Sequence, residues 1–390
     1  MPKTERKTNR APQGAGGICK RSDGRWQGTY TVGTNPGTGK PAKKYVYANT
    51  EKECVKKLKA LQAAVDGGTF QQPSRMTVGQ WLDVWEAEYL GGVKPGTVRT
   101  YKVQIAQHIK PALGAVKLQK LAPHAIQAFY NALQREKGLS PKTIKNVHGV
   151  FHGALQQAAA LDYIRFNPAD KCKFPRIERK EVAVLSEDKI PAFIQQAGQD
   201  VYGTLMYVTL FTGLRESEAL GLTWDCVDFA GGTISIRRQL QRDTAADTYA
   251  LAPLKNDKPR QITPAPTVMQ RLRARQVQQK TDQLRVGPDW NNPLNLVFTN
   301  EFGKNLIQRT VVKKFKDVAA AIDVPGLRFH DLRHTYAVNA LQSGDDVKTV
   351  QDALGHHTAA FTLDTYGHVT DRMKQASADR MERFIQANSK

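Results

Sequence analysis

Residues 328–334 read Arg-Phe-His-Asp-Leu-Arg-His, so His330 and Arg333 stand three positions apart. The next helix-like segment closes on a Gly-His pair that ends at His356, and Tyr366 lies ten residues beyond that histidine. Imidazole changes its protonation state near neutral pH, guanidinium stays charged, and a phenol can act as a covalent nucleophile. The combination therefore indicates catalysis at an anionic group.

Upstream pieces add a second arginine and a lysine. Residues 212–220 read Thr-Gly-Leu-Arg-Glu-Ser-Glu-Ala-Leu and contain Arg215. Glu218 follows three residues later, one helical turn on, where its carboxylate can orient the guanidinium. Residues 254–262 place a lysine five positions before an arginine. In order and spacing over residues 212–366, these pieces resemble the catalytic signature of the tyrosine recombinase (phage integrase) family.

The resemblance implies that Tyr366 attacks a scissile phosphate and leaves a 3′-phosphotyrosine link and a free 5′-hydroxyl. A phenol has a reference pKa near 10 and is only about 0.1% ionised at neutral pH, so it needs a base. We expect His330 to accept its proton and His356 to donate to a phosphate oxygen. Because the covalent bond keeps the phosphodiester energy, no cofactor is expected.

The negative charge that builds on the phosphate needs fixed donors, which usually make the largest catalytic contribution. Arg215 and Arg333 suit this role because a guanidinium fork fits phosphate oxygens and stays protonated. The family protonates the leaving 5′ oxygen with a lysine in a β-hairpin, and Lys255 has the family's five-residue spacing to Arg260. Lys258 is the alternative, since many relatives have threonine where an asparagine follows Lys255 here.

A zinc site is the alternative interpretation of the histidines. His330, Asp331 and His334 mimic the His-Glu-x-x-His helix of metalloproteases. The aspartate is a methylene shorter than the glutamate that serves there as general base, and Arg333 would oppose a dication. Each piece taken alone is also typical of surface, capping or packing residues. The conjunction of five pieces in one order favours the recombinase.

Composition favours DNA as the partner. The formal net charge is +21 and the isoelectric point is about 9.8, a balance typical of proteins that bind nucleic acid or anionic membranes. No segment approaches the roughly 20 apolar residues of a membrane span, and no secretory segment opens the chain, so we expect a cytoplasmic, nucleoid-associated bacterial protein. The four cysteines are scattered without a Cys-x-x-Cys pair, which predicts reduced thiols.

The first 70 residues are the most densely charged. Residues 1–60 hold fourteen Lys and Arg against four Asp and Glu, and residues 1–14 read as a basic tail. Three short strands are predicted at 17–21, 25–33 and 43–48, and a capping box then starts a helix. The pattern, assigned to residues 1–70, resembles the arm-type DNA-binding domain of lambda-like and conjugative-transposon integrases.

We expect the sheet of this domain to enter the major groove of DNA. The alternative is that its aromatic side chains, Trp26, Tyr30 and Tyr45, form the core of a very small domain. The predicted DNA contacts are Arg25, Trp26, Tyr30, Lys43 and Lys44.

Residues 75–168 read as all helix. Thr77 and Gln80 form a capping box, Thr97 is expected to open the next helix, and Ser140-Pro141 starts another. The segment resembles the core-binding domain that clamps one face of the duplex. Its predicted phosphate contacts are Lys94, Thr97, Arg99, Lys142, Lys145 and Asn146.

Residues 169–184 read as a linker, and residues 185–390 as a mixed α/β catalytic domain that ends in a tail helix. The fold class is therefore a multidomain α+β chain: a three-stranded sheet with a helix, an all-helical domain and the catalytic domain. The tail has an apolar stripe that packs on its own domain or, as is common in this family, on a neighbour in a cyclic tetramer. The stripe comprises Met373, Ala376, Met381, Phe384 and Ile385.

The sequence thus predicts a site-specific DNA recombinase, the integrase of a mobile element. It would bind core-type and arm-type sites on double-stranded DNA, self-associate as a tetramer, and work with an excisionase or a host DNA-bending protein. A chromosome-dimer-resolving recombinase would lack residues 1–70. A tyrosine-type topoisomerase would share the chemistry without defined sites, and a non-catalytic DNA-binding regulator would need no complete catalytic set.

Overall fold

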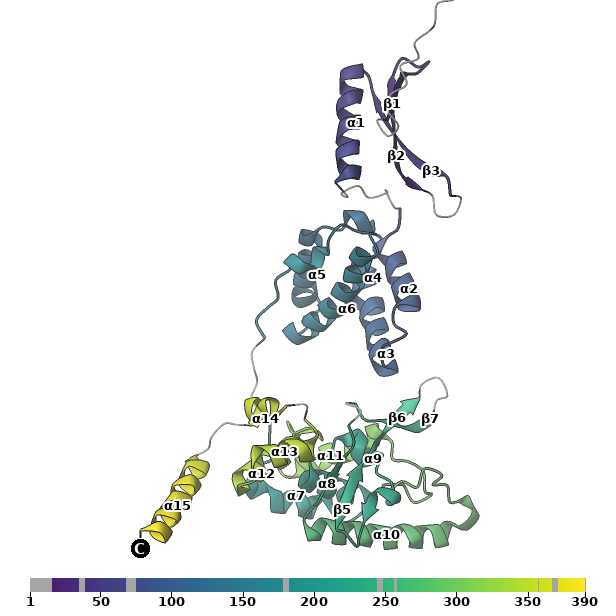
Figure 1. The fold of residues 1–390 in the computed structure, drawn as a ribbon. Helices are drawn as coiled ribbons and strands as arrows, with labels where there is room; N and C mark the ends of the chain where they lie inside the picture. Colours follow the sequence, from purple (N-terminus) through teal and green to yellow (C-terminus); the bar gives the residue numbers. More distant parts are fainter. Residues whose placement is uncertain are drawn as a thin grey trace, which may run out of the picture. The chain divides into compact units, whose positions relative to one another are not determined.

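The computed structural model describes residues 16–34, 39–67, 75–177, 182–243, 248–255, 258–356, 358–366 and 371–389 (Figure 1). The chain divides into two compact units, Met1–Arg179 and Lys180–Lys390. The predicted basic tail at residues 1–14 lies outside the described residues. Among the residues that the structure describes, no helix is long and apolar enough to cross a membrane. The four cysteines are free thiols.

The three strands predicted near the N-terminus are confirmed, and they form one antiparallel sheet in the order β1-β2-β3. Thr50 caps the following helix by accepting a hydrogen bond from the Glu53 amide. The helix covers one face of the sheet, where Cys54 and Leu58 pack against Gly28, a position with no room for a side chain. The bounds are β1 Gly17–Lys20, β2 Trp26–Thr34, β3 Pro41–Ala48 and α1 Glu51–Asp66.

The next segment is helical, as predicted. Thr77 and Gln80 form the expected capping box, and Ser140 caps a helix whose first residue is Pro141. Trp81 is fully buried, and its indole Nε1 donates to the Ala154 carbonyl at 2.8 Å. The bounds are α2 Val78–Glu88, α3 Pro95–Gln104, η1 Ile105–Ile109, α4 Lys110–Leu113, η2 Leu118–Lys120, α5 Pro123–Arg135, α6 Pro141–Ala160 and η3 Pro168–Lys171.

Two boundaries in this segment differ from the sequence prediction. Helix α3 begins at Pro95 rather than at Thr97, because proline is favoured in the first turn of a helix. Ala169, Cys172 and Phe174 pack in the core of the helical segment. The first residues of the predicted linker at 169–184 therefore belong to the helical segment. Their apolar side chains, which alternate with charged ones in the sequence, are buried against its core.

The C-terminal unit contains a helical core and two small antiparallel sheets, ordered β4-β5-β8 and β6-β7. The apolar helix α8 lies in the middle and contacts α7, α9, α10, α11 and α12. The bounds are η4 Glu187–Lys189, α7 Ile190–Ala197, α8 Val201–Thr212, α9 Glu216–Leu220, η5 Trp224–Cys226, β4 Val227–Asp228, β5 Thr233–Ile236, β6 Arg238–Asp243, β7 Thr248–Pro253, β8 Arg260–Ile262, α10 Pro266–Val286, η6 Gly287–Asp289, α11 Gln308–Ala321, α12 Asp331–Ser343, α13 Val347–Leu354, α14 Ala359–Tyr366 and α15 Asp371–Asn388.

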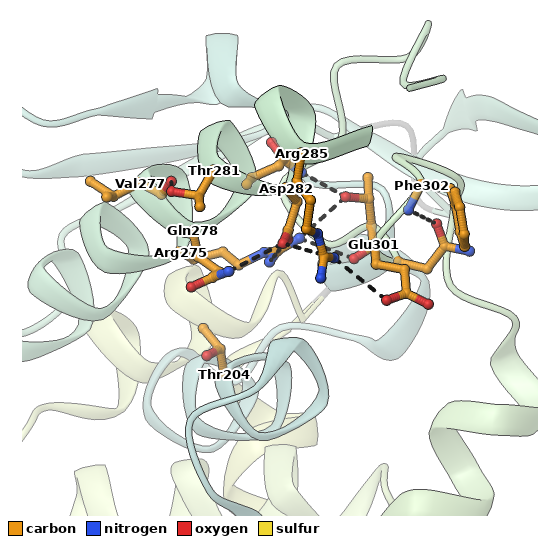
Figure 2. A network of polar contacts seen from close by, with 12 residues as sticks. Thr204, Arg275, Val277, Gln278, Thr281, Asp282, Arg285, Glu301 and Phe302 are labelled. Atoms are coloured by element: carbon orange, nitrogen blue, oxygen red, sulfur yellow. Dashed lines mark hydrogen bonds and ion pairs between the residues drawn. The ribbon is translucent and has the colours of Figure 1, made fainter. Parts of the chain in front are cut away.

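A buried polar network fastens α10 to the chain that precedes α11 (Figure 2). The Arg275 guanidinium donates to the carbonyl oxygens of Val297 and Thr299, at 3.3 and 3.0 Å. Asp282, also on α10, lies 3.7 Å from Arg275 and 3.5 Å from Arg285. Each charge has an opposite charge beside it, which offsets part of the cost of burying Arg275 and Asp282.

Candidate active site

Two glycine turns build the floor of the candidate site. Gly213 ends α8 and Gly355 ends α13, and both have positive φ, of 64° and 63°. Glycine adopts this left-handed conformation without strain, and it ends each helix there. The carbonyl oxygen of Gly213 accepts from Arg333 at 2.6 Å, and that of Gly355 accepts from Arg215 at 3.2 Å. The turns thereby fix two guanidinium groups that are distant in sequence.

Arg333 is the most deeply buried of these arginines. The residue is only 2% exposed, and its second hydrogen bond goes to the Leu354 carbonyl oxygen at 2.5 Å. Burial lowers the pKa of Arg333 to about 9, and the charge of Arg215 acts in the same direction. The guanidinium remains protonated at neutral pH, so a positive charge is held inside the protein.

Glu218 is a buried carboxylate shared by two arginines. Its Oε1 lies 2.6 Å from Arg215 and its Oε2 lies 2.6 Å from Arg260. Burial opposes ionisation, but the hydrogen bonds and charges of Arg260 and Arg215 outweigh it and lower the pKa of Glu218 to about 2. The contact expected between Glu218 and Arg215 is present. Two guanidinium groups thus share one carboxylate, whose charge also acts on Arg333.

Arg260 was not among the site residues expected from the sequence. It opens β8, and its Nε donates to the Ala353 carbonyl oxygen at 2.8 Å, beside the turn at Gly355. The five-residue spacing between Lys255 and Arg260 points to this arginine as much as to the lysine that it was used to select. Lys255 follows β7 and Lys258 precedes β8, and both side chains are exposed. The two residues between them lie outside the described residues.

Tyr366 ends α14 and is buried, with 5% exposure. Its phenolic oxygen is 2.6 Å from Nδ1 of His334. The His356 ring lies nearly parallel to the phenol, with 6.1 Å between ring centroids. Burial raises the pKa of Tyr366, against the opposing charges of Arg333 and Arg215. The candidate nucleophile is therefore neutral at rest and within the field of both arginines.

The sequence motif predicts that His330 accepts the phenol's proton, whereas in the structure the phenol contacts His334. One helical turn separates these histidines on α12, and their rings meet edge to face with centroids 5.0 Å apart. Burial, helped by neighbouring positive charge, lowers the pKa of His334 to about 4 and of His356 to about 3, and desolvation also lowers that of His330. All three imidazoles are neutral at pH 7. The i, i+4 spacing was visible in the sequence but was considered only for zinc.

Asp331, the other residue of the zinc interpretation, has a different partner. It is fully buried and accepts from the Arg328 amide at 2.7 Å and from the Arg328 guanidinium at 2.6 Å. These bonds secure the start of α12, where Asp331 is the first residue. The carboxylate is occupied by Arg328, and His334 faces Tyr366, so this geometry does not favour a metalloprotease-like site.

The N-terminal sheet divides the predicted DNA contacts between its two faces. Trp26 and Tyr30 share the face of Gly28, against α1, and the Tyr30 hydroxyl donates to Asp66 of that helix at 2.9 Å. Lys44 pairs with Tyr30 and lies on the same face. These three predicted groove contacts therefore lie on the face that packs against α1, because side chains alternate between the faces of a strand.

The opposite, open face of the sheet has a different set of side chains. Lys43 is exposed there, as are Tyr45 and Tyr47, at 47% and 43%. Arg21 lies over the Tyr47 ring at 5.5 Å. The alternative that Tyr45 is a core residue was therefore wrong. Tyr47 and Arg21, which also lie on this face, are not among the DNA contacts predicted from the sequence. Of the remaining predicted contacts, Arg25 lies in the β1–β2 turn and is paired with Asp23 at 2.9 Å.

The six contacts predicted in the helical segment are all exposed. Three lie at the start of α3 and three in the first turns of α6, and these two helices contact each other. Both starts therefore present polar and basic side chains to solvent. The residues are Lys94, Thr97, Arg99, Lys142, Lys145 and Asn146.

Comparisons with known proteins agree with this geometry. The phage integrase family matches residues 183–373, and the phage integrase N-terminal SAM-like domain matches residues 77–134. A XerC-like tyrosine recombinase of Caldanaerobacter subterraneus subsp. tengcongensis is 26% identical over 372 residues, covering 90% of this chain and 94% of the relative. The ICEBs1 integrase of Bacillus subtilis strain 168 is 23% identical over 384 residues, covering 94% and 100%. The Tn1549 transposon integrase in complex with circular intermediate DNA has the same fold, with a TM-score of 0.66 at 22% identity over 78% of this chain and 99% of that one.

Proposed function

Since this chain belongs to the phage integrase family of tyrosine recombinases, we propose that it is the integrase of a mobile element, which cuts and rejoins DNA for integration and excision. The two matching domain models cover well over half of the chain. The similarity to the ICEBs1 integrase extends over 94% of the chain, which supports the mobile-element function. A chromosome-dimer-resolving recombinase is the second candidate, favoured by the XerC-like relative.

One observation carries the catalytic part of the proposal: a buried tyrosine adjoins a cluster of positive charge that is not neutralised. The guanidinium groups of Arg215 and Arg260 share the carboxylate of Glu218, and the Arg333 guanidinium, on which the charge of that carboxylate acts, donates its hydrogen bonds to carbonyl oxygens. Uncompensated charge inside a protein is costly, and an anionic ligand that enters the cluster relieves that cost. A DNA phosphodiester supplies such an anion, and its position beside Tyr366 would make phosphorus the target of the phenol.

In the proposed reaction, Tyr366 attacks the phosphate and the leaving strand ends in a 5′-hydroxyl. Arg215 and Arg333 hold the non-bridging oxygens and stabilise the charge that develops on them. Glu218 keeps the Arg215 guanidinium in place. The exposed Lys255, with Lys258 as the alternative, would protonate the leaving oxygen, and the imidazoles of His330 and His356 would serve the phosphate. The chain's own residues are sufficient for these steps.

We propose two DNA-binding surfaces beyond the catalytic centre. The starts of α3 and α6 would contact the phosphates of the core-type site, through the six exposed side chains described above. The open face of the N-terminal sheet would enter the groove of an arm-type site, with Arg21, Lys43, Tyr45 and Tyr47 in contact. Trp26, Tyr30 and Lys44 would instead support the packing of α1.

We propose that copies of the protein associate on DNA through helix α15. Met381, Phe384 and Ile385 of this helix are 59%, 63% and 49% exposed, a stripe that would be covered by a neighbouring copy. A closed ring of four copies fits strand exchange between two duplexes. An enzyme of this kind acts on bacterial DNA in the cytoplasm, where an excisionase or a DNA-bending protein would set its direction. Crosslinking on DNA, with and without residues 371–390, tests the association.

The deciding experiment traps the covalent intermediate. A nicked suicide duplex made from the DNA that flanks the gene should form a protein–DNA adduct, and Tyr366→Phe should abolish the adduct while DNA binding remains. Tyr336→Phe is the matched control, since it removes a hydroxyl from α12 without touching the proposed chemistry. An adduct that survives in Tyr366→Phe would assign another nucleophile. Loss of cleavage in excess EDTA, restored by zinc, would revive the metal interpretation of His330 and His334.

A further inference from the structure

We infer that His334 is the general base that takes the phenolic proton from Tyr366 during attack on DNA. The inference rests on the proposed recombinase function and names a residue that the sequence analysis did not include in the catalytic set. It replaces His330 in the role of proton acceptor. The main evidence is the distance of 2.6 Å between the Tyr366 oxygen and the Nδ1 atom of His334.

The surroundings fix this contact in one geometry. His334 lies in the first turns of α12, whose start is secured by the buried Asp331, and Tyr366 closes α14, which packs against α12. The edge of the His330 ring covers one side of the His334 ring, and Tyr366 itself is almost entirely buried. A base must lie within about 2.6–3.2 Å of the proton that it removes, and this pair meets that requirement before DNA arrives.

The charges around the ring keep it ready to accept a proton. Burial lowers the pKa of His334 to about 4, the neighbouring His330 and Arg333 act in the same direction, as does Arg328, and Asp331 opposes them. The ring is therefore neutral at pH 7, with a lone pair for the phenol. A phosphate bound to the guanidinium groups would offset their charge, which would raise the basicity of His334 at the moment of attack.

The proton and electron balance of the step is complete. The Tyr366 O–H bond breaks and its proton moves to Nδ1 of His334, while an oxygen lone pair forms the bond to phosphorus. The bond from phosphorus to the 5′ oxygen breaks, and that oxygen takes a proton from the lysine. In the religation step a 5′-hydroxyl gives its proton to the lysine as its oxygen bonds to phosphorus. The bond from phosphorus to the Tyr366 oxygen breaks, and that oxygen takes back the proton held by His334.

The test measures nucleophile activation separately from departure of the leaving group. A suicide duplex with sulfur at the bridging 5′ position needs no proton on its leaving group, so its cleavage rate does not depend on the lysine. Single-turnover cleavage by the wild-type enzyme should change little between pH 6 and 9. His334→Ala and His334→Gln should cleave about 10²–10⁴-fold more slowly at pH 7, the range for loss of a general base. Their rates should rise nearly tenfold per pH unit, because the phenolate must form beforehand.

Two controls separate a base from a structural support. His334→Gln keeps a hydrogen-bonding group against the phenol, and added imidazole should restore part of the rate in His334→Ala. His330→Ala should retain the flat pH profile of the wild type. A uniform loss across pH without rescue by imidazole, or the steep profile appearing in His330→Ala instead, would overturn the assignment. Failure of the wild-type enzyme to form any Tyr366 adduct would instead overturn the recombinase function on which the assignment rests.

Discussion

Two buried arginines in the C-terminal unit, Arg275 and Arg333, resemble each other in packing and differ in charge balance. They are 6% and 2% exposed, and both donate to main-chain carbonyl oxygens of distant segments. Burial lowers the pKa of each. Arg275, however, has the carboxylate of Asp282 beside it (Figure 2). The hydrogen bonds of Arg333 go to carbonyl oxygens, and the carboxylate whose charge acts on it, Glu218, is ion-paired with two other arginines.

The difference supports a structural role for Arg275 and the proposed binding of an anion by Arg333. In the Arg275 network, Asp282 and Glu301 balance Arg275 and Arg285. Among the described side chains around Arg333, which include Arg215, Arg260 and Glu218, the positive charge exceeds the negative, in surroundings where charge interactions are stronger than in water. A protein retains such an imbalance where an anion binds. Buried arginine by itself therefore carries little functional information, and the count of carboxylates around it carries more.

The largest expected effect separates the two arginines directly. Arg333→Ala should lower DNA cleavage by about 10²–10³-fold or more, roughly 3–4 kcal/mol of transition-state stabilisation. Arg275→Ala should lower the free energy of unfolding by about 3–5 kcal/mol, because it breaks the buried pair with Asp282 and leaves that carboxylate the largely exposed Arg285 as its cation, yet the folded fraction should cleave normally. Suicide-substrate kinetics and chemical denaturation measure the two quantities. Equal loss of cleavage in both folded variants would contradict the different roles proposed for the two arginines.

Glu218→Gln should destabilise the folded protein by about 3 kcal/mol, since the guanidinium groups of Arg215 and Arg260 would lose the buried carboxylate that they share. Because the pKa of Glu218 is lowered in the folded state, its contribution is present above the ordinary pKa of a glutamate and is lost as pH falls towards about 2. Denaturation curves of wild type and variant should therefore converge below pH 4. Glu301→Gln, which removes an exposed partner of Arg285, is the control and should cost less than about 1 kcal/mol.

Inorganic phosphate should stabilise the protein through the same cluster. At a concentration about tenfold above its dissociation constant, a ligand that binds only the folded state adds about 1.4 kcal/mol. The thermal shift should exceed that of chloride at equal ionic strength, and it should disappear in Arg333→Ala but persist in Arg275→Ala. A shift that is the same in all variants would mean that phosphate acts elsewhere on this basic surface.

The smallest effect tests the same distinction in the N-terminal sheet, where Lys43 lies on the open face and Lys44 on the face against α1. Lys43→Ala should flatten the dependence of arm-site affinity on salt by about 0.9 log units per log of salt concentration, the value for one phosphate contact. Lys44→Ala is the matched control and should leave the slope unchanged. Binding titrations at several salt concentrations measure both, and the reverse result would place DNA on the other face.

Local chemistry explains what could be predicted from the sequence. Capping residues such as Thr77 and Ser140 set the starts of helices because their partners lie three residues away. The strands near the N-terminus and the glycine that ends α13 follow from equally short-range preferences. The order of Arg215, Arg333 and Tyr366 along the chain was enough to identify the family, because a set of residue types at family-like spacings can be read without a structure.

Tertiary structure decided which of these residues meet. Arg260 reaches Glu218 across 42 positions and His334 reaches Tyr366 across 32, so neither contact could be read from local spacing. The side of the N-terminal sheet that α1 covers depends on packing against Gly28, and that choice moved Trp26 and Tyr30 away from the open face. Sequence therefore determined the elements and the family. The charge balance of the catalytic cluster and the partner of the nucleophile came from long-range packing, which fixes contacts that no local preference specifies.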